Sequence, residues 1–239
     1  MTTLLVSDLH LDPERPALVE VFERFLRVKA PGARALYVLG DLFEAWIGDD
    51  DDSVLATQVA RALAALSARR VPIWFIHGNR DFLLGQTFAA RAGLQLLAEG
   101  TLHEIEGTPT LLAHGDSLCT DDLAYQRFRA QSRSVEWQRE FLAQPLLARR
   151  EFAARARLAS AAHTRDATAQ IMDVTSDAVA AALRAAGVRR LIHGHTHRPA
   201  VHHLALDGQA CERIVLADWY RAGSALALEA DSLRWLDLR

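Results

Sequence analysis

The stretch ALYVLGD, residues 35–41, places five apolar residues directly before a glycine and an aspartate. An uninterrupted apolar run of this kind is typical of a strand buried on both faces of a parallel sheet. Residues 4–6 and 73–76 repeat the pattern, and each run stops abruptly at polar residues. Between the runs at 35–39 and 73–76, Ser53 can cap a helix whose apolar residues recur at helical spacing over 55–66. These segments predict βαβ units and therefore an α/β sheet.

The C-terminal part of the chain predicts further strands, because short apolar runs lie close together there with turn residues between them. The runs cover residues 191–192, 201–206, 214–216, 225–228 and 233–238. Their close spacing predicts antiparallel strands that complete a second sheet. We therefore expect a single domain over residues 1–239, in which two sheets pack together and helices cover the outside.

The composition is that of an ordinary globular protein. The 239 residues include 27 basic and 30 acidic ones, a formal charge of −3, and half of the residues are apolar. This balance argues against nucleic acid as a partner, because nucleic-acid binders carry strongly basic domains or stripes. Two cysteines cannot form a disulfide scaffold and fit a reducing cytosol. No apolar run approaches the roughly 18 residues that span a bilayer, so we expect a soluble, unexported protein.

The polar residues that end the apolar runs form a chemically coherent set. In an open α/β sheet, residues just beyond the carboxyl ends of the strands converge in one crevice. The set comprises two carboxylates, one amide and four imidazoles: Asp8, Asp41, Asn79, His10, His114, His195 and His197. Oxygen and nitrogen ligands without thiolates suit manganese, iron or zinc. Seven ligands are too many for one tetrahedral ion, whereas two ions about 3.5–4 Å apart are the usual machinery for displacement at phosphorus.

Each motif alone has a simpler interpretation. A lone Asp-x-His or Gly-Asp is commonly a turn or a helix cap, and a lone His-x-His can belong to an ordinary strand. All five motifs in order resemble the calcineurin-like metallophosphoesterases: Asp8-x-His10, Gly40-Asp41, Gly78-Asn79, His114-Gly115 and Gly194-His195-x-His197. The resemblance implies an αββα sandwich. It also implies that one metal is held by Asp8, His10, Asp41 and His197, and the other by Asp41, Asn79, His114 and His195, with Asp41 bridging.

Arg80 departs from the Gly-Asn-His pattern that is usual in that superfamily. An arginine is always charged and cannot serve as a proton donor, but its planar fork can bind a phosphate through two nitrogens. This property favours a substrate whose leaving group needs charge neutralisation, such as a pyrophosphate.

Residues 121–170 lack glycine and contain nine arginines against six acidic residues, a surplus of +3 that leaves −6 for the rest of the chain. Apolar residues are interleaved with these arginines. One interpretation is a helical lid that receives acyl chains and touches an anionic membrane surface. The other is an ordinary helical insertion whose arginines form a solvated face.

A run of four aspartates, residues 49–52, stands directly before the helix that Ser53 would cap. It resembles a third metal site. Acidic residues are also favoured before a helix by the helix dipole, and we interpret the run as a solvated cap.

Longer stretches resemble one family within that superfamily, the pyrophosphatases of lipid A biosynthesis. They are residues 40–51, 75–85, 114–116, 118–122, 171–174 and 191–201. The resemblance implies hydrolysis of UDP-2,3-diacylglucosamine, in which water activated by two Mn²⁺ ions attacks the α-phosphate and gives UMP and 2,3-diacylglucosamine 1-phosphate (lipid X). It also implies a peripheral location on the cytoplasmic face of the inner membrane, and it indicates no obligate protein partner.

By position, the resemblance implies that substrate is contacted by Asn79, Arg80, Asp122, Ser160, Thr164 and His195, with Arg80 stabilising charge. Two positions depart from the family pattern: Thr164 stands where asparagine is frequent, and Ala167 where lysine is usual. Two alternative functions are a phosphodiesterase or nucleotide pyrophosphatase acting on soluble substrates, and a non-catalytic scaffold that keeps the phosphoesterase fold.

Overall fold

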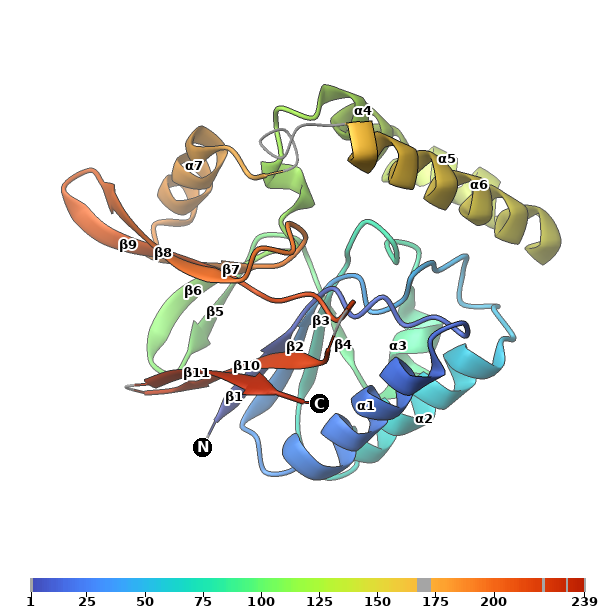
Figure 1. Cartoon of the computed structure of the whole chain (residues 1–239), viewed down its shortest axis with the longest axis horizontal. Coiled ribbons are helices and arrows are strands. Elements are labelled where there is room, and N and C mark those ends of the chain that lie inside the picture. The colour runs from blue at the N-terminus through green and yellow to red at the C-terminus, as the bar shows by residue number, and fades with distance from the viewer. Residues whose placement is uncertain (1, 167–172, 221, 231, 239) are drawn as a thin grey trace.

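The computed structural model describes residues 2–166, 173–220, 222–230 and 232–238, and of residues 161–166 the helical backbone alone. Two sheets pack face to face, and helices cover their outer faces (Figure 1). The first sheet has the order β11-β10-β1-β2-β3-β4 and the second the order β5-β6-β7-β9-β8. This arrangement agrees with the predicted sandwich.

The strands of the first sheet are β1 (Thr3–Val6), β2 (Ala35–Leu39), β3 (Ile73–Ile76), β4 (Gln95–Leu97), β10 (Ser224–Glu229) and β11 (Ser232–Asp237). Those of the second are β5 (Thr101–Ile105), β6 (Thr108–Leu112), β7 (Arg190–His193), β8 (Ala200–Leu206) and β9 (Gln209–Val215). The apolar runs at residues 4–6, 35–39 and 73–76 therefore all form strands, as predicted.

The partners of the last two strands differ from the prediction. We expected all C-terminal strands to complete the second sheet, but β10 lies antiparallel to β1, with Leu4 opposite Ala227, and β11 pairs with β10. The edge of β1 that does not face β2 carries buried backbone groups that need hydrogen-bond partners, and β10 supplies them. Apolar spacing identifies a strand but does not indicate which sheet edge it joins.

The helices on the sandwich are α1 (Pro16–Arg24), continued by a π-helical turn η1 (Phe25–Lys29), α2 (Val54–Ser67), α3 (Gln86–Ala92) and α7 (Ser176–Ala186). Helices α1, α2 and α3 cover the first sheet, and α7 covers the second (Figure 1). The predicted cap of α2 is confirmed, because the Ser53 hydroxyl accepts a hydrogen bond from the Ala56 N–H at 3.1 Å. Aliphatic side chains such as Leu5, Ile192 and Leu226 fill the space between the sheets.

Three further helices form a separate layer, the helical lid: α4 (Leu123–Ser132), α5 (Val135–Leu142) and α6 (Leu146–Asp166). They occupy the stretch predicted as a helical insertion, and Figure 1 shows them beyond the loops that follow the parallel strands. Trp137, Phe141 and Phe152 pack their rings together and join α5 to α6. Among the described residues, no helix is both long and apolar enough to cross a membrane.

Candidate metal centre and active site

Loops that follow β1, β2, β3, β6 and β7 bring the seven predicted ligands together. Asp8, His10 and His197 form one group that could hold a metal ion. The His197 Nε2 atom lies 3.3 Å from Asp8 Oδ1, and His10 Nε2 lies 3.7 Å from Asp41 Oδ2. The carboxylates of Asp8 and Asp41 are almost completely buried.

A second group shares Asp8 with the first. Asp8, Asp41 and His114 again place ligand atoms within reach of one ion. The Asn79 side-chain oxygen lies 3.0 Å from His114 Nε2 and 2.9 Å from His195 Nδ1. Because Asp41 Oδ1 lies 3.7 Å from His114 and Oδ2 lies 3.7 Å from His10, this carboxylate stands between the two groups, as a bridging ligand would.

The backbone at the site is held in an unusual conformation. Asp8, His10, Asp41, His195 and His197 all have positive φ, between 49° and 67°. This left-handed region is uncommon for residues other than glycine, and such strain persists only where the surrounding structure enforces it. Five of the seven predicted ligands share the feature, which singles out the loops as a functional site.

Two glycines allow these loops to approach one another. A Cβ atom on Gly78 would lie 2.1 Å from Asp41 Oδ1, and one on Gly194 would lie 1.9 Å from Ser7 Oγ and 2.3 Å from Asp8 Oδ2. No side chain fits at either position. The two carboxylates therefore occupy places that only glycine leaves open.

Asp81 orients the loop that follows β2, a role that we did not predict although the residue lies in a quoted motif. Its carboxylate accepts hydrogen bonds from the N–H groups of Gly78 at 2.8 Å, Leu42 at 2.7 Å and Asp41 at 3.3 Å. Burial, together with the nearby Asp41 carboxylate, raises the pKa of Asp81 to about 7. The backbone contacts of Asp81 exist only in the folded chain, so the sequence motif does not indicate them.

Other neighbours fix the orientation of individual ligands. The Ser7 hydroxyl donates to Asp8 Oδ2 at 2.6 Å. His114 Nδ1 lies 2.8 Å from the carbonyl oxygen of Leu39, so this nitrogen carries the proton and Nε2 presents its lone pair to the site. Glu44 Oε2 lies 3.3 Å from His10 Nδ1 in the same role. Carboxylates and carbonyls behind ligating histidines are a regular feature of metal sites.

The electrostatics of the pocket fit a divalent cation. Burial opposes protonation of His114, yet the carboxylates of Asp41 and Asp8 raise its pKa to about 9. Burial likewise disfavours the charged form of Asp8, but His197 and neighbouring imidazoles hold its pKa well below the usual range. Within the described chain, the Nε2 atom of the buried His10, which faces the centre, has no hydrogen-bond partner. Buried carboxylates beside an imidazole nitrogen without a partner are the donor set that a metal ion completes.

Comparison with known proteins agrees with this geometry. The family model for calcineurin-like phosphoesterases matches residues 1–199. The chain belongs to the calcineurin-like phosphoesterase family. With the hydrolases named below, this membership makes the protein a metal-dependent hydrolase.

Two relatives show how far the similarity extends. The chain is 54% identical to the UDP-2,3-diacylglucosamine hydrolase of Stenotrophomonas maltophilia (strain K279a) over 96% of both proteins. It is 53% identical to the protein of the same name from Xanthomonas campestris pv. campestris (strain ATCC 33913), over 98% of this chain and 97% of that one. Among solved structures, TT1561 of Thermus thermophilus matches with a TM-score of 0.51 at 15% identity, over 100% of this chain and 99% of that one, which shows the shared fold.

In this calcineurin-like phosphoesterase, an apolar cavity of about 330 Å³ lies between the β3 loop and the helical lid. Asn79, Arg80 and Ser160 line it together with large apolar side chains: Trp46, Phe82, Phe128, Trp137, Phe141 and Phe152. The Arg80 guanidinium donates to the Ser160 hydroxyl at 3.3 Å and so joins the metal centre to α6. Three predicted substrate contacts, Asn79, Arg80 and Ser160, therefore line this apolar cavity.

The remaining predicted substrate contacts have different settings. The Asp122 carboxylate accepts from the Tyr125 N–H at 2.9 Å and caps α4. His195 stacks loosely on Tyr125, with 6.0 Å between ring centroids. The side chain of Thr164 and all of Ala167 lie outside the described residues.

Helix α4 is attached to the centre through Asp116, which sequence analysis did not single out. Tyr125 and Arg129 both donate to the buried Asp116 carboxylate, Arg129 at 2.8 Å. Arg133 donates to the carbonyl oxygen of Gly78 at 2.9 Å. Tyr125 and Arg129 are four residues apart on α4, a spacing that is common on solvated helices, so the partner that they share, Asp116, is visible only in the fold.

The interpretation of residues 49–52 as a solvated cap holds only in part, because Asp50 and Asp52 are exposed but Asp49 has a different role. Asp49 accepts hydrogen bonds from the N–H groups of Gly85 and Phe88 at 2.8 and 2.9 Å, and thereby orients the start of α3. Asp50 pairs with Arg149, and both Asp51 and Asp52 pair with Arg150. Arg149 is buried and is therefore an anchor of the lid, so the solvated-face interpretation fails for it, whereas Arg150 is 47% exposed and makes its ion pairs at the surface.

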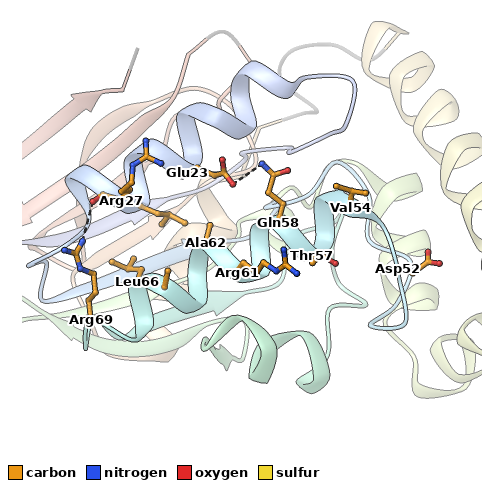
Figure 2. Close-up of a pocket in the computed structure, with 12 residues that line it drawn as sticks. Glu23, Arg27, Asp52, Val54, Thr57, Gln58, Arg61, Ala62, Leu66 and Arg69 are labelled. Carbon is orange, nitrogen blue, oxygen red and sulfur yellow. Dashed lines mark hydrogen bonds between the residues drawn. The ribbon is translucent and has the colours of Figure 1, made fainter.

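A second hollow, of about 970 Å³, lies between α1 and α2, on the helical layer that covers the outer face of the first sheet (Figure 2). Figure 2 shows Glu23 reaching Gln58, a hydrogen bond of 2.9 Å, while Arg69 points toward the backbone of Arg27. It contains none of the predicted ligands. We therefore assign the chemistry to the metal centre.

Proposed function

We propose that this phosphoesterase hydrolyses the pyrophosphate bond of UDP-2,3-diacylglucosamine, with water attacking the α-phosphate to give UMP and 2,3-diacylglucosamine 1-phosphate. The observation that carries the proposal is the cavity of about 330 Å³ that begins at Asn79 and Arg80 and continues between apolar side chains under the lid. A soluble nucleotide has no use for such a cavity, whereas acyl chains fill it by the hydrophobic effect. The names of the relatives at 53–54% identity support the same substrate.

The proposed cofactor is a pair of Mn²⁺ ions, one held by Asp8, His10, Asp41 and His197 and the other by Asp41, Asn79, His114 and His195. Such a pair supplies activated water and neutralises charge on the phosphoryl group. The chain contributes orientation: the Leu39 carbonyl fixes the tautomer of His114, and the backbone N–H of Arg80 donates to Asp41 Oδ1 at 2.8 Å.

Arg80 is the residue that we assign to charge stabilisation. Its Nε atom is buried and has no hydrogen-bond partner in the described part of the chain, so one N–H remains for a phosphoryl oxygen. A guanidinium that already faces the place where negative charge develops needs no reorganisation during the reaction. Asn79 and His195, on the same side of the centre, complete the proposed phosphate contacts.

We further propose that the protein works at the cytoplasmic surface of the inner membrane. Leu147 and Leu158 on α6 are both largely exposed and lie 11 residues apart, which is about three helical turns and places them on one side. Exposed Leu123 and Val135 on α4 and α5 add to the apolar surface of the lid. Apolar side chains among arginines suit an interface with anionic lipid.

The test is an assay of UDP-2,3-diacylglucosamine with and without Mn²⁺ in ¹⁸O-water. We expect metal-dependent release of UMP that carries the label, because water attacks the α-phosphorus. Label in the sugar phosphate would refute the position of attack. Equal activity on a UDP-sugar without acyl chains would favour the soluble-substrate alternative, and protein that is inert with Mn²⁺ would favour the non-catalytic scaffold.

The membrane proposal has its own test, sedimentation with phosphatidylglycerol vesicles. Replacing Leu147 and Leu158 by glutamate should lower the bound fraction several-fold, and added salt should lower it further. The control is Leu102→Glu on β5, which is exposed but lies on the sheet sandwich. Unchanged binding of the double variant would place the membrane contact elsewhere.

A further inference from the structure

An open groove of about 670 Å³ begins at the metal ligand His197 and runs along the first sheet at β10 and β11. We infer that this uridine groove, lined by His197, Pro199, Asp218, Tyr220, Ser224 and Trp235, binds the nucleoside half of the substrate. The inference rests on the proposed function and names a subsite for the part of the substrate that the apolar cavity does not hold.

The position of the groove relative to the apolar cavity is the first argument. The cavity begins at Asn79 and Arg80 and the groove at His197, and the two share no lining residue. The buried carboxylates of Asp8 and Asp41 belong to the metal centre, which both hollows adjoin. In UDP-2,3-diacylglucosamine the pyrophosphate joins the uridine to the acylated sugar. A substrate that fills both hollows therefore places its pyrophosphate at the metal centre.

The wall of the groove packs directly against residues of the metal centre, which is the second argument. Tyr220 stacks on the ring of His10, with 4.7 Å between centroids and 19° between planes, and lies 5.4 Å from the ring of His197. The Trp219 N–H donates to the carbonyl oxygen of Asp8 at 3.0 Å, and the Tyr220 N–H donates to Asp218 Oδ2 at 3.0 Å. The wall of the groove is thus attached directly to the loop that carries two metal ligands.

The chemistry of the lining suits a nucleoside, which is the third argument. Trp235 on the edge strand β11 is 39% exposed and offers an aromatic face on which a uracil ring can stack. The carboxylates of Asp218 and Asp237 can accept hydrogen bonds from ribose hydroxyls and from the uracil N3–H. Arg15, which pairs with Glu44 at 3.1 Å, places its guanidinium 5.0 Å from the Tyr220 ring centroid and packs against the back of this wall.

The experiment measures the affinity of UMP by equilibrium dialysis in the presence of Mn²⁺, with inorganic phosphate as the comparison ligand. We expect Trp235→Ala to weaken UMP binding about tenfold, the order of one lost base–aromatic stack, and to leave phosphate binding unchanged. Trp235→Phe should retain most of the affinity, since it keeps an aromatic face. The matched control is Arg234→Ala, an exposed neighbour on β11 that does not line the groove and should bind UMP as wild type does.

A second measurement separates the two halves of the substrate. The inhibition constant of 2,3-diacylglucosamine 1-phosphate should be the same for Trp235→Ala and wild type, because the lipid product lies in the apolar cavity. Wild-type UMP affinity in Trp235→Ala, or an equal loss of phosphate affinity, would overturn the inference. Wild-type protein that binds UMP through Trp235 but does not hydrolyse UDP-2,3-diacylglucosamine would support the groove and refute the proposed function.

Discussion

Arg149 and Asp50, 99 residues apart in the chain, form a two-pronged ion pair that anchors α6 to the loop after β2. One Arg149 nitrogen donates to Asp50 Oδ1 at 2.8 Å, and the second contacts Asp50 Oδ2. The Arg149 side chain is only 3% exposed, whereas that of Asp50 is 58% exposed. The pair raises the pKa of the arginine and lowers that of the aspartate. The lid is therefore attached to the catalytic core through a buried guanidinium.

Arg149→Ala should loosen the lid and destabilise the protein. The substitution removes donors from the carbonyl oxygens of Ile47 and Gln144, and unsatisfied buried acceptors cost about 1–3 kcal/mol, or roughly 2–10 °C in Tm. Calorimetry checks the stability, and the acyl-chain dependence of kcat/KM checks the lid. Arg155→Ala is the control, because Arg155 is exposed and pairs weakly with Glu151, so its Tm should hardly change. An equal effect of both substitutions would contradict the anchoring role.

Gly194→Ala should lower metal content, since its Cβ would displace the Asp8 carboxylate from which it would lie 2.3 Å. The measurement is bound manganese after gel filtration. Gly208→Ala is the matched control: its φ of +75° makes alanine strained by about 1–2 kcal/mol, but no atom lies within 4 Å of the new methyl group. The control should lose stability and keep its metal. Loss of metal from both variants would show that general destabilisation, and not the clash with Asp8, causes the loss.

Arg80→Ala should lower kcat about 100-fold or more while the protein keeps its metal, because removing a donor to a developing anion typically costs about 10²–10³-fold. The backbone N–H that holds Asp41 survives the substitution, which separates catalysis from metal binding. Arg80→Lys should recover only part of the rate, since lysine lacks the fork. If manganese content falls in parallel with the rate, Arg80 supports the metal centre and not the substrate.

Manganese should raise the Tm of the metal-free protein in a concentration-dependent way. Bound ions compensate the buried carboxylates of Asp8 and Asp41, and a ligand at 100 times its Kd stabilises the folded state by about 2.7 kcal/mol. Differential scanning fluorimetry after EDTA treatment measures the shift. Asp41→Asn weakens the proposed bridge and should show a much smaller shift, so an identical shift in that variant would exclude Asp41 as a ligand.

Cys119 should resist alkylation in the folded protein. Burial, with the Asp116 carboxylate nearby, raises the pKa of this thiol to about 12, so the reactive thiolate is scarce at pH 8–9. In the unfolded chain the pKa returns to about 8.5, and labelling should be rapid. Since the folded pKa is the higher one, the contribution of this thiol to stability is complete below about pH 8.5 and falls as the pH rises further. Mass spectrometry after iodoacetamide treatment reads out the labelled residue.

The sequence predicted most of the strands and the seven candidate ligands that the structure brings together, because both depend on local order along the chain. Five polar motifs each follow an apolar run, and parallel strands place their carboxyl ends at one edge. The cap at Ser53 is equally local, since donor and acceptor are three residues apart. The spacing of residues along the chain was therefore sufficient to predict the strands, the five motifs that follow them and the Ser53 cap.

Other features required the folded chain. Whether β10 joins one sheet or the other depends on which strand edge lacks a partner, and apolar spacing does not contain that information. The pairs of Arg149 with Asp50 and of Arg150 with Asp52 join charges 98–99 residues apart, each of which looks like a solvated residue in its own segment. The same holds for Asp81 and Asp116, whose partners come from separate loops and from α4. Sequence determined the strands and the candidate ligands that follow them, whereas only tertiary packing decided the sheet edge, the anchors of the lid and the positions of the hollows, because those depend on contacts between residues distant along the chain.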